Sequence, residues 1–350
     1  MATVAASSIP ISQIARRHDR KVGLWLLVCA GMIFVMVILG GITRLSGSGL
    51  SIMEWDPLMG ALPPLSTAEW NRVFDLYRGI AQYKHINAGM TLPEFQGIFW
   101  WEYAHRLWGR LIGLVFFLPF LWFLARGYLR RSWAPKLGAI FLLGALQGAI
   151  GWYMVASGFE DRVSVSQYRL VIHLLMALLI YALILWSALD LLRPDDAKGA
   201  QLRMHGGVLL LAIAVELALG GLVAGLHGGL VYNDFPLMNG DWVAPDVFAT
   251  QPWWRAIGAD PGTAQFMHRL GAGLIALLVV ALAWRAWRSQ VLPGRTAVLL
   301  AALLLQIALG ISTLMLVVPL PLAVMHQAGA VLLLSATLFF LHGLPRDAAR

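Results

Sequence analysis

The sequence predicts an all-α integral membrane protein with eight transmembrane helices, arranged as two pseudo-symmetric four-helix bundles. Three observations support this fold class. Of the 350 residues, 59% are hydrophobic and only 13% are charged, whereas roughly a quarter of a soluble domain is charged. The apolar residues form long runs. Motifs of the first half of the chain also recur in the second half.

Eight apolar runs are long enough to cross a bilayer, which takes about 20 residues each. In chain order they cover roughly residues 22–41, 99–125, 134–157, 167–191, 204–225, 264–287, 295–317 and 322–343. We divide the chain into an N-terminal segment (1–21), a first four-helix half (22–193), a second half (204–343) and a tail (344–350). Each half has an even number of spans, so the repeat keeps one orientation in the membrane.

The basic residues in the segments between the spans lie mainly on one side of the membrane. They precede the first span and follow the second, fourth, sixth and eighth: Arg16, Arg17, Arg20, Lys21, Arg126, Arg130, Arg131, Lys136, Arg193, Lys198, Arg203, Arg285, Arg288, Arg295, Arg346 and Arg350. The positive-inside rule then predicts that both termini are cytoplasmic and that the long loops 42–98 and 226–263 lie outside. The net charge of +8 reflects this topology. Because the basic residues are divided among short loops, no nucleic-acid partner is expected.

The internal repeat is visible in short motifs. Leu39-Gly40-Gly41 matches Leu219-Gly220-Gly221, and Glu102-Tyr103-Ala104-His105-Arg106-Leu107 matches Gln265-Phe266-Met267-His268-Arg269-Leu270. Gln147-Gly148-Ala149-Ile150-Gly151 likewise resembles Gln306-Ile307-Ala308-Leu309-Gly310. Each half therefore forms a four-helix bundle, and such bundles hold cofactors between facing helices.

Four histidines occupy matching places in the repeat. His105 and His173 lie in the second and fourth spans of the first half, and His268 and His326 lie in those of the second. These spans all start on the outer side, so the two histidines of a half share a similar depth. Two axial ligands of one haem need this arrangement. A small residue also follows each histidine at i+4 (Gly109, Ala177, Ala272 and Ala330), on the same helix face.

The neighbours of these histidines distinguish the two halves. Arg106 and Arg269 directly follow a histidine, and a guanidinium suits haem propionates, although snorkelling to the interface is the plainer interpretation. Glu102 in the first half corresponds to Gln265 in the second. A carboxylate beside a haem can exchange protons and a glutamine cannot, so the first half is predicted to carry the chemistry. The alternative is a structural ion pair between Glu102 and Arg106 at i+4.

Other interpretations of the histidines remain open. A single intramembrane histidine can be a hydrogen-bonded packing residue, but four at matched depth favour function. Zinc fits less well, since zinc sites usually recruit about three or four protein ligands. His227, in the second long loop, is expected to serve that loop. The single cysteine, Cys29, lies in the first span and is expected to be a small apolar filler.

The motifs together resemble those of the heme A synthase family, CtaA in bacteria with mitochondrial relatives, over about residues 22–343. The specific parts are the run from Gly41 to Ser51 (GITRLSGSGLS), Glu102-Tyr103-Ala104-His105-Arg106, and the four histidines. Some members have a cysteine pair in the first outer loop, and this chain has none there.

The resemblance implies that haem O is converted to haem A by oxidation of the C8 methyl to a formyl group. The substrate haem would lie at His105 and His173, with Arg106 beside it and Glu102 as the acidic catalytic group. A haem b cofactor would lie at His268 and His326 and relay electrons. The same resemblance implies a bacterial cytoplasmic (inner) membrane location and haem O synthase as a partner. The topology above predicts that the haem sites lie toward the outer face and that lipid surrounds the helices. The electron donor is not identified by the sequence.

Two other functions fit part of the pattern. A dihaem b-type protein that oxidises quinol would use both histidine pairs but give Glu102 no role. A transporter of haem or another small molecule would fit the parallel repeat, and it predicts ionisable groups near mid-bilayer. Glu216 in the fifth span is the clear candidate for such a group.

Overall fold

The computed structural model describes residues 11–55, 60, 62–159, 162–192 and 199–345. Each predicted span is a helix. In chain order the long helices are α1 (Ile11–Leu45), α4 (Leu92–Ala125), α5 (Trp133–Ala156), α6 (Gln167–Leu192), α7 (Arg203–Gly225), α9 (Pro261–Arg288), α10 (Pro293–Met315) and α11 (Leu320–His342). All eight are long and apolar enough to cross a membrane, which confirms the predicted fold class.

Two helices extend beyond the predicted spans, because hydropathy marks only the apolar part of a helix. α1 begins at Ile11, ahead of the basic cluster of the N-terminal segment. α4 begins at Leu92, about two turns before the predicted residue 99. Its start is fixed by a capping box in which Thr91 and Glu94 bond each other's backbone, with proline in the first turn.

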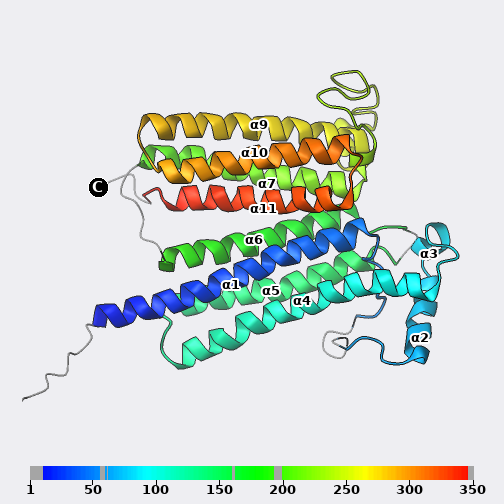
Figure 1. Ribbon diagram of the computed structural model, residues 1–350, viewed down its shortest axis with the longest axis horizontal. Coiled ribbons are helices and arrows are strands. Elements are labelled where there is room, and N and C mark those ends of the chain that lie inside the picture. Colours follow the sequence, from blue (N-terminus) through cyan, green and yellow to red (C-terminus); the bar gives the residue numbers. More distant parts are fainter. Residues whose placement is uncertain (1–10, 56–59, 61, 160–161, 193–198, 346–350) are drawn as a thin grey trace, which may run out of the picture.

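The loops at one end of the bundle contain short helices that the sequence did not predict. α2 (Thr67–Arg78) and α3 (Ala81–His85) lie between α1 and α4, and α8 (Trp253–Ala259) precedes α9. We call this the loop end (Figure 1). A separate aromatic cluster, including Phe74 and Tyr77 of α2 and Phe95 and Phe99 of α4, fastens α2 to the extended start of α4.

The two halves pack through their first and last helices. α1 contacts α4, α6 and α11, while α7 contacts α6, α9 and α11. In Figure 1 the helices α4 and α5 flank this centre on one side, and α9 and α10 flank it on the other. The described chain starts and stops at the same end, opposite the loop end, as an even number of spans requires.

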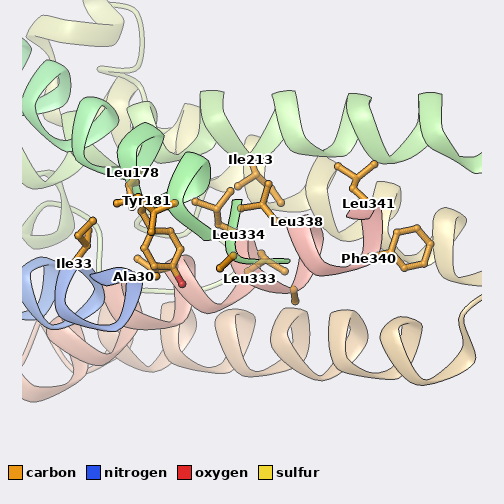
Figure 2. Packing of buried hydrophobic residues seen from close by; sticks show 14 of the residues in the cluster. Ala30, Ile33, Leu178, Tyr181, Ile213, Leu333, Leu334, Leu338, Phe340 and Leu341 are labelled. Atoms are coloured by element: carbon orange, nitrogen blue, oxygen red, sulfur yellow. The ribbon is translucent and has the colours of Figure 1, made fainter. Parts of the chain in front are cut away.

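The hydrophobic core lies where the halves meet. Figure 2 shows Ala30 and Ile33 of α1, Leu178 and Tyr181 of α6, and the α11 leucines in one cluster. Within it, Tyr181 Oη and Ser335 Oγ are 2.7 Å apart and join α6 to α11 by a hydrogen bond. The two halves therefore pack against each other through one continuous core.

Large apolar side chains face outward along the spans. Leu142 and Leu211 are each 67% exposed and Leu277 is 71% exposed, as expected for helices surrounded by lipid. Several residues used above to assign orientation, Arg193, Lys198, Arg346 and Arg350, lie outside the described residues, as do residues 1–10 of the N-terminal segment.

Candidate functional site

Both histidine pairs lie toward the loop end of the bundle. His105 is on α4 and His173 on α6, while His268 is on α9 and His326 on α11. At about 1.5 Å rise per residue, His173, His268 and His326 lie roughly 9–11 Å from their helix starts. His105 lies roughly 20 Å from the start of α4, because α4 carries the extra turns that bind α2. Each of the four histidines therefore lies in the part of its helix nearest the loop end.

The geometry of the second pair suits a metal held between two imidazoles. The ring centres of His268 and His326 are 6.3 Å apart and the ring planes make an angle of 85°. With metal–nitrogen bonds of about 2.0 Å, and about 1.1 Å from nitrogen to ring centre, two axial imidazoles have ring centres roughly 6.2 Å apart. In the first pair, His105 and His173 are close enough to interact electrostatically.

Each of the four rings lies against a glycine on a neighbouring helix. An ideal Cβ on Gly40 or Gly220 would lie 3.1 Å from Cε1 of His105 or His268, and on Gly151 or Gly310 it would lie 2.8 or 2.9 Å from Cε1 of His173 or His326. These glycines belong to the repeated motifs: Gly40 matches Gly220, and Gly151 matches Gly310. The same contact is therefore built four times, consistent with the pseudo-symmetry.

Gly109, one of the small residues at i+4, has a different environment from these glycines. A Cβ on Gly109 would meet the Met36 methyl at 3.1 Å rather than a histidine. The glycine that faces each ring comes from the adjacent helix. The sequence analysis could not predict that contact, because helical periodicity shows which residues share one face of a helix but not which helix packs against that face.

Glu102 is a buried carboxylate with four donors. Its Oε2 accepts from Ser51 Oγ at 2.8 Å and from the Ile52 backbone N–H at 2.9 Å. Its Oε1 accepts from Arg106 Nη2 at 2.6 Å and Nε at 3.1 Å. The ion pair with Arg106, one of the two interpretations above, is therefore present. Arg106 also donates to the backbone oxygens of Ile52 and Glu54, so the pair fastens the loop after α1.

Gln265 occupies the matching position in the second half. Its loop-facing atom is a hydrogen-bond donor, whereas the loop-facing oxygen of Glu102 is an acceptor. The Gln265 amide Nε2 donates to the backbone oxygens of Gly228 and Tyr232, both at 2.9 Å. Its Oε1 accepts from Arg269 Nη2 at 3.2 Å. Arg269 also donates to Leu237 O at 2.7 Å. Both glutamine and glutamate are thus accommodated in this position, and each helps anchor an outer loop. The contact of Arg106 and Arg269 with propionates stays a prediction.

A link between the halves lies at the loop end. Arg44 Nη2 donates to Ala224 O at 2.9 Å and lies 3.2 Å from His227 Nε2. Burial, then the nearby Arg44 charge, lowers the pKa of His227. The expected loop role of His227 is thus matched by a contact between α1 and the segment after α7.

Glu216 was assigned above only to the transporter hypothesis, yet it lies beside a paired histidine. Its Oε1 is 2.8 Å from His268 Nδ1. This is ion-pair distance without the alignment of a hydrogen bond. The repeat carries a signal that points to this residue: Glu216 precedes Gly220 by four residues, as Met36 precedes Gly40. Aligning the two halves position by position places Glu216 opposite Met36, so the second half has a charged residue where the first half has none.

A second kind of candidate metal site would be a cluster of His, Cys, Asp or Glu side chains among the residues that the structure describes. No group of three or more His, Cys, Asp or Glu side chains there could hold a metal ion. Three features fit haem iron. Each site offers two histidines as ligands, a glycine without a side chain lies against each ring, and the rings of the second pair have a separation near that of axial imidazoles. These features do not fit the three or four protein ligands usual for zinc.

Comparison with known proteins agrees with this geometry. The profile of the COX15-CtaA family, described as cytochrome oxidase assembly protein, matches residues 23–338. A heme A synthase of Nitrosospira multiformis is 48% identical over 97% of this chain and 99% of its own length. Heme A synthases of Rhodospirillum centenum and Paramagnetospirillum magneticum are 47% and 45% identical, each over 98% of this chain and over 93% and 99% of their own lengths. The chain therefore belongs to the COX15-CtaA family of multi-pass membrane proteins.

Proposed function

We propose that this protein is a haem A synthase, an oxidoreductase that oxidises the C8 methyl of haem O to the formyl group of haem A. The observation that carries the proposal is the similarity, at 45–48% identity over 97–98% of the chain, to the three relatives named heme A synthase. Two successive hydroxylations would turn the methyl into a geminal diol, which loses water to give the formyl group. Each hydroxylation is a two-electron oxidation of the methyl carbon and needs an oxidant and an oxygen atom from outside this chain.

The first histidine pair is proposed to hold the substrate. His105 and His173 would be the axial ligands of haem O, with Arg106 near a propionate and Glu102 at the reaction. Both oxygens of Glu102 accept two hydrogen bonds each, so the carboxylate is fixed in place. A preorganised negative charge is suited to stabilise positive charge that develops on the substrate during oxidation.

The second pair is proposed to hold a resident haem b between His268 and His326, with Arg269 near a propionate. A bound haem b would supply a one-electron carrier there. The surrounding residues hold the two rings: Gly220 and Gly310 leave them room. Gln265 and Arg269 anchor the loop above them through backbone oxygens.

The cellular setting is proposed from the charge pattern. The basic residues between spans support a topology in which both termini would be cytoplasmic and both histidine pairs would lie in the outer half of a bacterial cytoplasmic (inner) membrane. Haem O synthase would deliver the substrate, and a separate electron donor would complete the redox reaction. A dihaem quinol-oxidising protein is the second candidate. It leaves the buried Glu102 without a chemical role, and the relatives do not favour it.

The direct experiment is mass analysis of haems extracted from haem O-producing cells with and without this protein. Haem A should appear only with the protein; haem O alone in both would refute the proposal. Glu102→Gln should retain haem but reduce haem A formation by about 10²–10³-fold, the usual effect of losing preorganised electrostatic stabilisation. Glutamine keeps the size of the side chain and can still accept from Arg106, as Gln265 accepts from Arg269, but its amide would face the Ile52 N–H. Haem content and thermal unfolding of the variant therefore check that it folds.

The control is Glu94→Gln, about two turns earlier on α4, where the carboxylate only caps the helix. It should form haem A at the normal rate. If Glu102→Gln does so too, the catalytic role of Glu102 is wrong. His268→Ala and His326→Ala should each remove the haem b spectrum, and an unchanged reduced spectrum in both would contradict the second site.

A further inference from the structure

Glu216 is a carboxylate on α7 within the membrane-spanning bundle, with 13% of its side chain exposed. Among the described residues, its oxygens have no hydrogen-bond partner. The cationic or polar group at ion-pair distance is His268 Nδ1, at 2.8 Å. Ionisable groups inside a bilayer are costly and are retained mainly where they function. The contact with a candidate iron ligand indicates what that function is.

Two positions differ together between the halves at this point. Glu216 lies against the bare backbone of Gly271: an ideal Cβ there would come within 1.9 Å of its Oε2. The equivalent residues in the first half are Met36 and Trp108. The Trp108 indole crosses to α1 and donates to Met32 O at 2.8 Å. The second half thus has a carboxylate with the glycine that makes room for it, where the first half has a thioether and a large indole.

Among the described residues, no carboxylate lies at ion-pair distance from Nδ1 of the other three paired histidines. Nδ1 of His105, His268 and His326 all lack an aligned hydrogen bond there, so the nearby carboxylate is what sets His268 apart. His173 Nδ1 lies 3.1 Å from the amide of Gln147. The carboxylate–histidine contact therefore distinguishes the proposed electron-carrying site from the proposed substrate site.

We propose that Glu216 is a positioning residue for the second site: its carboxylate, 2.8 Å from Nδ1 of His268, keeps the proton on that nitrogen by charge attraction and lowers the midpoint potential of the iron bound there. This inference rests on the proposed haem b at His268 and His326. With the proton held at Nδ1, Nε2 is the nitrogen free to ligate. A carboxylate behind a ligating histidine makes the imidazole more electron-donating, and its negative charge stabilises ferric over ferrous iron in a medium of low dielectric constant.

The test is a spectroelectrochemical titration of the purified full-length protein. Glu216→Gln should keep haem b and its six-coordinate reduced spectrum, yet shift the midpoint potential upward. Glu216→Met, which places the first-half residue at this position, should shift it upward further, since it removes the polar contact as well as the charge. Met36→Gln, at the equivalent position of the first half, is the matched control and should leave the potential of the second haem unchanged.

A midpoint potential that stays at the wild-type value in both Glu216 variants, with haem b bound, would overturn the inference. That result differs from failure of the proposed site itself. If His268→Ala and His326→Ala both keep the haem b spectrum, haem b is bound elsewhere, and the premise fails rather than the role of Glu216. If the histidine variants lose haem b and Glu216→Gln shifts the midpoint potential upward, both the proposed haem b site and the role of Glu216 are supported.

Discussion

Gly310→Ala is expected to weaken haem binding at the second site without unfolding the protein. The added methyl would lie 2.9 Å from Cε1 and 3.4 Å from Nδ1 of His326. Carbon atoms in good contact are about 3.5–4.0 Å apart, so the ring or α10 must move by roughly 0.5 Å or more. Metal–ligand distances are held within about 0.2 Å, and the pair already has a ring separation of 6.3 Å that suits axial ligation.

The expected size of the effect follows from the cost of overpacking, about 1–3 kcal/mol. If that strain falls on the ligand geometry, binding weakens by roughly 5- to 150-fold, at about 1.4 kcal/mol for each factor of ten. Replacing glycine by alanine inside a helix also gains up to about 1 kcal/mol of helix propensity. The variant should therefore retain its fold while losing haem.

The assay compares haem b content and affinity with thermal unfolding in detergent. Gly294→Ala is the matched control, because it places the same methyl on α10 where an ideal Cβ meets nothing within 4 Å. It should bind haem normally. Wild-type affinity in Gly310→Ala, or an equal loss in Gly294→Ala, would refute the reasoning that the bare glycine surface sets the ring position.

Two further predictions concern stability away from the histidine pairs. His342 is fully buried with Nε2 3.0 Å from Asp190 Oδ1, and Lys136 Nζ lies 3.7 Å from the other oxygen. His342→Ala should destabilise the protein by about 2–5 kcal/mol in thermal melts while leaving the haem spectrum unchanged; a wild-type melting temperature would contradict this. A hydrogen bond to Asp246 raises the pKa of Tyr232 to about 12. This folded-state value lies above the unfolded value near 10, so the bond stabilises fully below pH 10 and its contribution is lost as pH rises to about 12. Between pH 9 and 12 the wild type should lose more stability than Tyr232→Phe, and parallel pH profiles would count against the bond.

Local sequence was sufficient to predict the eight spans and the two candidate pairs. Long apolar runs leave few structures other than membrane helices, because every backbone polar group must be satisfied within the segment. Helix ends were less well predicted. α1 and α4 begin earlier than their apolar parts, because their first turns, with the basic residues of α1 and the capping box at Thr91 before α4, are too polar to belong to an apolar run. The short helices α2 and α8 were missed for the same reason.

The amino-acid sequence by itself determined which residues repeat and on which helix each histidine lies. Only the tertiary structure decided which helices meet: the two halves contact each other through α1, α6, α7 and α11. It also placed Gly310 of α10 against His326 and Glu216 of α7 beside His268. The physical reason is that helical periodicity fixes the face a side chain occupies. The partner of that face depends on the rotation and packing of helices that lie tens of residues apart in the chain.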